Sequence, residues 1–198
     1  MRGALLVLAL WGAAAAAQGV PQGFPARFDV AGVGPGDALN VRAGPSASAP
    51  VLDRLPPGAR GVEVLGVSPD GAWARVPLPE GEGWASLRFL RARDADPRAI
   101  PTPLACAGTE PFWSLTTAEG GAVWERPGED ARTLREVGRA SAFSGFAIAY
   151  DDDGRARDLT VARAGCSDGM SERPYGLRAL AWDREGELLE GCCRLLPE

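Results

Sequence analysis

Four cysteines are the residues of this chain whose types lend themselves most directly to chemistry. They lie at Cys106, Cys166, Cys192 and Cys193 of 198 residues. Cysteine thiolates bind soft metals or act as nucleophiles, whereas oxidised cysteines tie distant segments together. The chain has no C-x-x-C pair, which is typical of dithiol redox sites, so redox catalysis is disfavoured.

The N-terminus indicates export. Residues 1–17 combine one basic residue, an apolar run over residues 4–11 and small residues at Ala15 and Ala17. This pattern predicts a signal peptide that is cleaved before Gln18, and an uncleaved anchor is the alternative. We therefore expect a periplasmic or secreted protein, and no later stretch approaches the roughly 20 apolar residues of a membrane span.

In an oxidising compartment, four cysteines in one small domain favour two disulfides. Because neighbours in a strand point to opposite faces, Cys192 and Cys193 should pair with different partners. We expect Cys106 and Cys166 each to take one of them, and both pairings remain open. A strained vicinal disulfide and a thiolate site for a soft metal are the alternatives.

Carboxylates supply two further candidate sites. The run 151–154, with Asp158, resembles a calcium loop, but it lacks a further carboxylate in register and is better interpreted as a solvated hairpin turn. Glu110, Asp168 and Glu172 could supply a carboxylate pair of the kind that glycosidases use. The sequence does not show which of these carboxylates lie near one another.

Composition excludes several classes of function. All 21 basic residues are arginines, and the chain contains no histidine and no lysine. Catalytic histidines, Schiff-base lysines and histidine-ligated metals are therefore excluded. The net charge is −5 and the basic residues form no run, which argues against nucleic acid as a partner. We expect no cofactor, no metal and no enzymatic activity.

The first half of the chain alternates short apolar stretches with turn residues. This pattern predicts five short strands in about 55 residues, hence a small all-β barrel. The expected strands are residues 39–42, 51–55, 62–66, 73–76 and 84–90.

Six motifs in this region resemble the bacterial SH3 domain. They are ALNVRAGP at 38–45, PVL at 50–52, LPPG at 55–58, VEVLG at 62–66, GAW at 71–73 and GWASL at 83–87. The resemblance covers residues 37–90 and implies an SH3-like barrel that binds cell-wall peptides or protein partners, without catalysis. Asn40 and Arg42 lie in the first motif, and we interpret them as bracing the turn at Gly44.

Two tryptophans of this domain are candidates for a ligand platform. Trp84 leads into an apolar stretch and is expected in the core. Trp73 follows a turn and is the better candidate for a partly exposed platform. Because loops carry function while strands carry packing, we expect a groove between residues 68–71 and 77–83.

The second half predicts another compact antiparallel β domain, a barrel or a sandwich of six or seven strands. Hairpin signals lie at Gly120, at the acidic turn 151–154 and near Gly186. Residues 132–137 suit either a strand or a helical turn. Three cysteine-containing blocks, 106–113, 166–175 and 189–193, resemble an uncharacterised family of bacterial envelope domains over residues 106–194. The resemblance implies an exported or lipid-anchored domain, and the family has no assigned activity.

In the second domain, Asp168, Arg173 and Tyr175 are the polar and aromatic residues that we expect to line a pocket. With Trp73 they form the predicted set of ligand-binding residues. The expected domains are a signal peptide at 1–17, a loose leader at 18–36, an SH3-like domain at 37–90, a proline-rich linker at 91–105 and a disulfide-containing β domain at 106–198.

The hypothesis that follows is an exported binding protein of the cell envelope that recognises cell-wall peptide or an envelope protein. One alternative is an inhibitor of an envelope-directed enzyme, which would block a cleft with the loop Ser167–Tyr175. Another is a hydrolase that uses the carboxylates.

Overall fold

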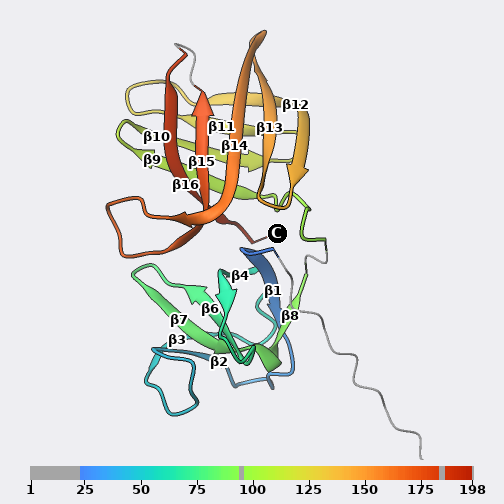
Figure 1. Ribbon diagram of the computed structural model, residues 1–198, viewed down its shortest axis with the longest axis vertical. Coiled ribbons are helices and arrows are strands. Elements are labelled where there is room, and N and C mark those ends of the chain that lie inside the picture. The colour runs from blue at the N-terminus through green and yellow to red at the C-terminus, as the bar shows by residue number, and fades with distance from the viewer. Residues whose placement is uncertain (1–22, 94–95, 183–185, 198) are drawn as a thin grey trace, which may run out of the picture.

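The computed structural model describes residues 23–93, 96–182 and 186–197, so the predicted signal peptide lies outside the described residues. The described chain is all-β and forms two units, one above the other in Figure 1. Its helical content within these residues is one short 3-10 turn, η1 (Leu87–Phe89). The predicted fold class, an SH3-like domain followed by a second β domain, is confirmed.

The first unit contains two small antiparallel sheets, with strand orders β4-β1-β8 and β3-β2-β7-β6-β5. Its strands are β1 (Ala26–Val30), β2 (Leu39–Arg42), β3 (Val51–Leu55), β4 (Val62–Val64), β5 (Gly66–Val67), β6 (Trp73–Pro77), β7 (Glu82–Ser86) and β8 (Leu90–Ala92). Each stretch that was predicted to be extended contains strand, although 62–66 divides into β4 and β5 and 84–90 contains η1.

Strand β1 corrects the prediction of a loose leader at residues 18–36. Ala26, Phe28 and Val30 alternate toward the core and are buried, and β1 pairs with both β4 and β8. Their alternation is typical of a half-buried strand. The glycines and prolines on either side concealed this signal, because they are residues that favour turns.

The second unit is a closed antiparallel barrel of eight strands in which each strand pairs with the next along the chain. The strands are β9 (Leu104–Thr109), β10 (Phe112–Ala118), β11 (Gly121–Glu125), β12 (Arg132–Ala142), β13 (Gly145–Asp152), β14 (Arg155–Cys166), β15 (Tyr175–Trp182) and β16 (Leu188–Leu195). Pairing of β16 with β9 closes the barrel. The undecided segment 132–137 lies in β12, and β9 was not predicted as a strand.

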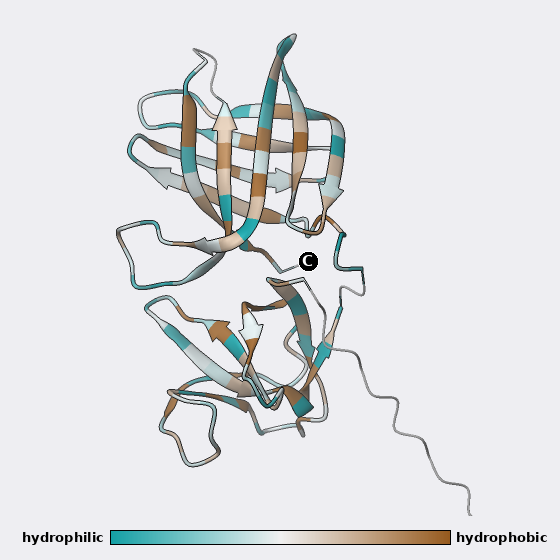
Figure 2. Cartoon of the chain, in the orientation of Figure 1, coloured by the Kyte–Doolittle hydropathy of each residue, from teal (hydrophilic) through white to brown (hydrophobic). Residues whose placement is uncertain are grey.

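Side chains fill the barrel interior. Apolar and polar residues alternate along its strands, as Figure 2 shows, so that each strand has one inward and one outward face. Trp113 and Trp124 stack inside with ring centroids 5.3 Å apart. The Trp113 indole N–H donates to the backbone carbonyl of Glu190 at 3.0 Å, which satisfies its polar atom at the barrel wall.

Both disulfides join the predicted partners. Cys106 pairs with Cys193, its direct neighbour across β9 and β16, and both are buried. Cys166, at the end of β14, pairs with Cys192. The adjacent cysteines thus point to opposite faces of β16, one into the barrel and one toward the loop 167–174.

The two units are joined by buried charged groups. The side chain of Arg27 donates to the carbonyl oxygens of Leu196, Pro101 and Pro103. Glu63 accepts the backbone N–H of Leu195 at 3.0 Å and a guanidinium N–H of Arg173 at 3.0 Å. The predicted linker is correspondingly shorter than residues 91–105, because its two ends belong to β8 and β9.

Candidate binding sites

The turn before β6 positions Trp73. Asp70 accepts hydrogen bonds from the hydroxyl of Ser68 and, at 3.0 Å, from the backbone N–H of Ala72. The backbone N–H of Trp73 donates to the Ser68 hydroxyl at 3.0 Å. The Ser68 hydrogen bond, followed by that of Ala72, lowers the pKa of Asp70, so the turn is built around a carboxylate. The indole therefore leaves the turn in a defined direction.

Trp73 lines a groove of about 550 Å³ on the first unit. The remaining walls come from residues 32–42, Ala47, Ala72, Ser86 and η1, and not from the expected loops at 68–71 and 77–83. Trp73 is partly exposed, and Phe89 in the same groove carries the Arg88 guanidinium 4.4 Å above its ring. The groove thus combines two aromatic rings with charged rims.

Arg42 braces the adjacent turn, as interpreted from the sequence. Its guanidinium donates to the carbonyl oxygen of Ala49 at 2.7 Å. Asn40 lies one pleat earlier on the same face of β2 and also lines the groove.

The prediction that Trp84 is a core residue is wrong. Trp84 is partly exposed, whereas its neighbours Gly83 and Ala85 face the interior. A Cβ atom at Gly83 would lie 2.5 Å from the Val41 side chain, so this face of β7 leaves no room for a larger residue. The tryptophan occupies the opposite face, level with Arg42 and Arg75.

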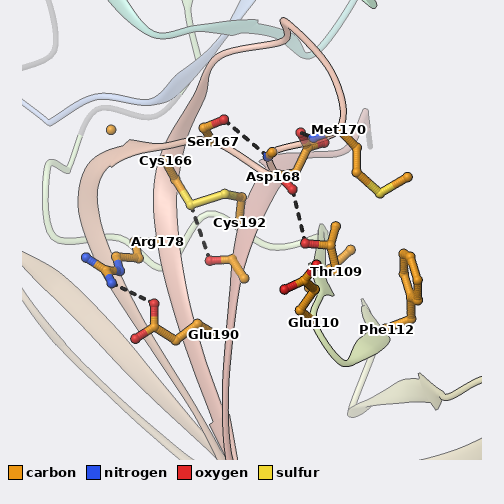
Figure 3. Close-up of a pocket in the computed structure, with 15 residues that line it drawn as sticks. Thr109, Glu110, Phe112, Cys166, Ser167, Asp168, Met170, Arg178, Glu190 and Cys192 are labelled. Carbon is orange, nitrogen blue, oxygen red and sulfur yellow. Dashed lines mark hydrogen bonds and ion pairs between the residues drawn. A yellow bond between two sulfur atoms is a disulfide. The ribbon is translucent and has the colours of Figure 1, made fainter.

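A second pocket, of about 690 Å³, lies on the barrel (Figure 3). It is bounded by the turn between β9 and β10, by the start of the β14–β15 loop and by the facing parts of β15 and β16. Asp168, one of the predicted ligand-binding residues, lines this pocket. The Thr109 hydroxyl donates to the Asp168 carbonyl oxygen at 3.1 Å and ties two of the walls together.

The Asp168 carboxylate organises the loop. It accepts the backbone N–H groups of Met170 (3.0 Å) and Ser171 (2.9 Å), the Ser171 hydroxyl (3.0 Å) and the Tyr175 hydroxyl (3.0 Å). Desolvation raises the pKa of Asp168, but the hydrogen bonds outweigh it and hold that pKa below its ordinary value. Asp168 is therefore ionised at neutral pH.

Arg173 and Tyr175, the other two residues predicted to bind a ligand in this domain, do not line the barrel pocket. Tyr175 acts through its hydrogen bond to Asp168, and desolvation followed by that bond raises its own pKa. Arg173 turns away to the first unit, where it pairs with Glu63 and donates to the Leu78 carbonyl at 3.3 Å. The contact partners of Arg173 come from a distant segment, which sequence reasoning could not supply, whereas Asp168 lies only seven residues before Tyr175.

The side chains of Phe112, Met170, Arg178 and Glu190 line the pocket but do not belong to the predicted set of ligand-binding residues. Phe112 and Met170 are 53 % and 69 % exposed at the pocket, and Arg178 pairs with Glu190 at 2.6 Å. For Phe112 a signal existed, because it alternates with Trp113 on β10 and a buried Trp113 places Phe112 outside. Met170 lies in a loop and carries no such signal.

The three candidate carboxylates of the hydrolase hypothesis do not all lie in one place. Glu110 and Asp168 line the same pocket, whereas Glu172 lies against the first unit, with its backbone N–H donating to Glu80 at 3.1 Å. The loop of the inhibitor hypothesis therefore also contacts the first unit.

The acidic run is a hairpin turn between β13 and β14, as expected. Asp151 accepts the backbone N–H of Gly154 at 3.0 Å, and the buried carboxylate of Asp152 pairs with Arg157 at 3.1 Å. Within residues 23–93, 96–182 and 186–197, no three His, Cys, Asp or Glu side chains are grouped as a metal site requires.

Comparison with known proteins identifies one of the two units. No curated protein and no solved structure matches the chain. Among the described residues, no helix has the length and apolar character needed to cross a membrane. One family model matches, and its span begins after β1 and ends within β8. Residues 37–91 match the family described as the bacterial SH3 domain, and this part of the chain is a bacterial SH3 domain.

Proposed function

We propose that this is an exported, non-catalytic binding protein of the cell envelope, whose bacterial SH3 domain recognises cell-wall peptide through the Trp73 groove. The family match carries the proposal, since it indicates a module for binding cell wall or protein. Two disulfides are compatible with a location outside the cytoplasm.

The chemistry of the groove suits a short peptide. Trp73 offers a partly exposed aromatic ring, Asp37 offers a carboxylate, and Arg88 offers a guanidinium that lies over the Phe89 ring. A wall peptide carries both amino and carboxyl groups on small aliphatic residues, so it matches a groove with both charges and an apolar floor. An aromatic residue in a pocket is also a common energetic anchor.

A role without catalysis is supported by the barrel pocket. A general acid of the glycosidase kind needs a raised pKa, whereas the hydrogen bonds of Asp168 lower its pKa. Those bonds come from its own loop and from Tyr175, so the carboxylate is engaged in holding the loop.

Retention on purified peptidoglycan tests the proposal. Trp73→Ala should stay folded and lose most retention, because the indole is partly exposed in the groove. Trp84→Ala is the matched control, since Trp84 is also partly exposed but lies outside the groove, and it should bind like the unmodified protein.

Equal retention of Trp73→Ala and Trp84→Ala would remove Trp73 from the site. An inhibitor of an envelope enzyme would ignore the polymer and bind the enzyme instead, so absence of retention of the unmodified protein contradicts the wall-peptide proposal.

A further inference from the structure

We propose that the barrel pocket is a second binding site, which takes a polypeptide segment bearing a lysine or arginine side chain beside apolar residues. The site lies on the second unit and does not involve the Trp73 groove, so it stands independently of the function proposed for the SH3 domain.

The charges of the pocket favour a cation. Three acidic residues line it, Glu110, Asp168 and Glu190, against one basic residue, Arg178. Arg178 is already paired with Glu190 at 2.6 Å, and Asp168 is ionised. Glu110 is exposed and has no ion pair or side-chain hydrogen bond to the described residues. An entering ammonium or guanidinium group would therefore meet an uncompensated negative charge.

One side of the pocket carries apolar side chains. In the view of Figure 3, Met170 and Phe112 lie on the side away from the Arg178–Glu190 pair, with Glu110 between the two groups. Both are largely exposed, and a thioether is an adaptable contact for apolar side chains. A cationic side chain with apolar neighbours matches a carboxylate beside apolar side chains better than a small inorganic cation does.

The occupant should be extended because Phe112 borders two hollows. It lines both the 690 Å³ pocket and a hollow of about 440 Å³ that is formed with residues 125–129. A polypeptide can fill one hollow with its cationic side chain and the other with a neighbouring residue. An isolated amine would occupy only the first.

The site is rigidly formed before any ligand binds. The Cys166–Cys192 disulfide anchors the base of the loop, and the Asp168 hydrogen bonds hold its start. On the opposite wall, Gly108 and Gly191 allow Trp113 to pack directly against the backbone. A Cβ atom added at Gly108 or Gly191 would lie 2.1 Å or 2.7 Å from the indole ring. Pre-organisation of this kind lowers the entropic cost of binding.

Titration calorimetry with two synthetic peptides tests the proposal on the oxidised full-length protein. The probes are acetyl-Leu-Lys-Leu-Lys-Leu-amide and its counterpart with both lysines replaced by glutamate. We expect saturable binding of the lysine peptide that weakens with added salt, and no binding of the glutamate peptide. Equal binding of both peptides, or no saturable binding of the lysine peptide, overturns the proposal.

Charge reversal at one residue locates the site. Glu110→Lys should weaken binding by about tenfold or more, because it places a cation beside the incoming one. Glu119→Lys is the matched control, because Glu119 is also an exposed glutamate and lies in the turn beyond the opposite end of β10, and it should change affinity by less than about twofold. Equal effects of the two variants would overturn the assignment.

Two further variants separate the contributions. Phe112→Ala should weaken binding at high and low salt alike, because an apolar contact is not screened. Trp73→Ala should bind the lysine peptide unchanged, and loss of binding in that variant would place the peptide on the SH3 domain and overturn the proposal. Peptidoglycan retention therefore tests the Trp73 groove and peptide calorimetry tests the barrel pocket, so that one proposal can fail without the other.

Discussion

Arg27 and Glu63 lie directly opposite each other on β1 and β4, and both side chains form hydrogen bonds to the end of the barrel. The partner of Glu63 is the last residue of β16, and the partner of Arg27 is the residue after it. Arg27 donates to the carbonyl of Leu196 at 2.8 Å, and Glu63 accepts the N–H of Leu195 at 3.0 Å. Two buried charges of opposite sign on the first unit thus recognise two successive residues at the end of the second. Buried charges are costly unless paired, so they hold the units in one arrangement.

Glu63→Ala should lower the free energy of unfolding by about 3–5 kcal/mol, because it leaves the Leu195 N–H and the Arg173 guanidinium without their acceptor. Glu63→Gln keeps an acceptor oxygen and should cost clearly less. Urea unfolding measures both. Glu80→Ala is the control from the exposed rim of the same interface, and its cost should stay within about 1 kcal/mol. An equal loss in the free energy of unfolding for Glu63→Ala and Glu80→Ala would show that the buried contact stabilises the protein no more than the exposed one.

The pH dependence of unfolding should carry a signature of Glu63. Desolvation raises the pKa of this carboxyl above its ordinary value of 4.5, against the opposing Leu195 and Arg173 contacts. The folded protein therefore holds the Glu63 proton more tightly than the unfolded chain does. The contribution of this protonation to the free energy of unfolding is complete below about pH 4.5 and is lost as the pH rises through the raised pKa. The free energy of unfolding, measured as a function of pH, should lack this contribution in Glu63→Gln. Identical pH profiles of Glu63→Gln and the unmodified protein would contradict the prediction.

The two disulfides should differ in what they support. The chain-entropy relation assigns about 4–5 kcal/mol to closing the loop between Cys106 and Cys193, and about 3–4 kcal/mol to that between Cys166 and Cys192. Replacing the first pair by serine should unfold the barrel at lower urea. Replacing the second should also release the loop 167–174 and increase its proteolysis. Alkylation of any cysteine in denatured, unreduced protein would contradict both pairings.

Gly108→Ala should destabilise the barrel by about 1–3 kcal/mol, since a Cβ atom there would lie 2.1 Å from the Trp113 indole nitrogen and 2.3 Å from the Glu190 carbonyl oxygen. Gly138→Ala on β12 is the control, because nothing lies within 4 Å of its Cβ position. Thermal unfolding compares them. A similar melting temperature for the two variants would show that the wall beside Trp113 is looser than these distances indicate.

The sequence alone determined features that depend on local pattern. Alternation of apolar and polar residues, broken by turn residues such as Gly71 and Gly120, indicated most strands of both units, because pleat and turn geometry are properties of adjacent residues. The separate partners of Cys192 and Cys193 followed from the same alternation. The SH3 motifs carried enough of this local pattern to identify the first domain.

The tertiary structure decided whatever depends on segments that meet from afar. Trp84 faces outward because Gly83 is closed off by Val41, more than 40 residues away along the chain. Arg173 pairs with Glu63, which lies 110 residues earlier in the chain. The closure of β16 on β9 and the recruitment of β1 into the first unit are pairings of the same kind. Such contacts depend on which backbone groups and charges a distant segment leaves unsatisfied, and local periodicity carries no information about that.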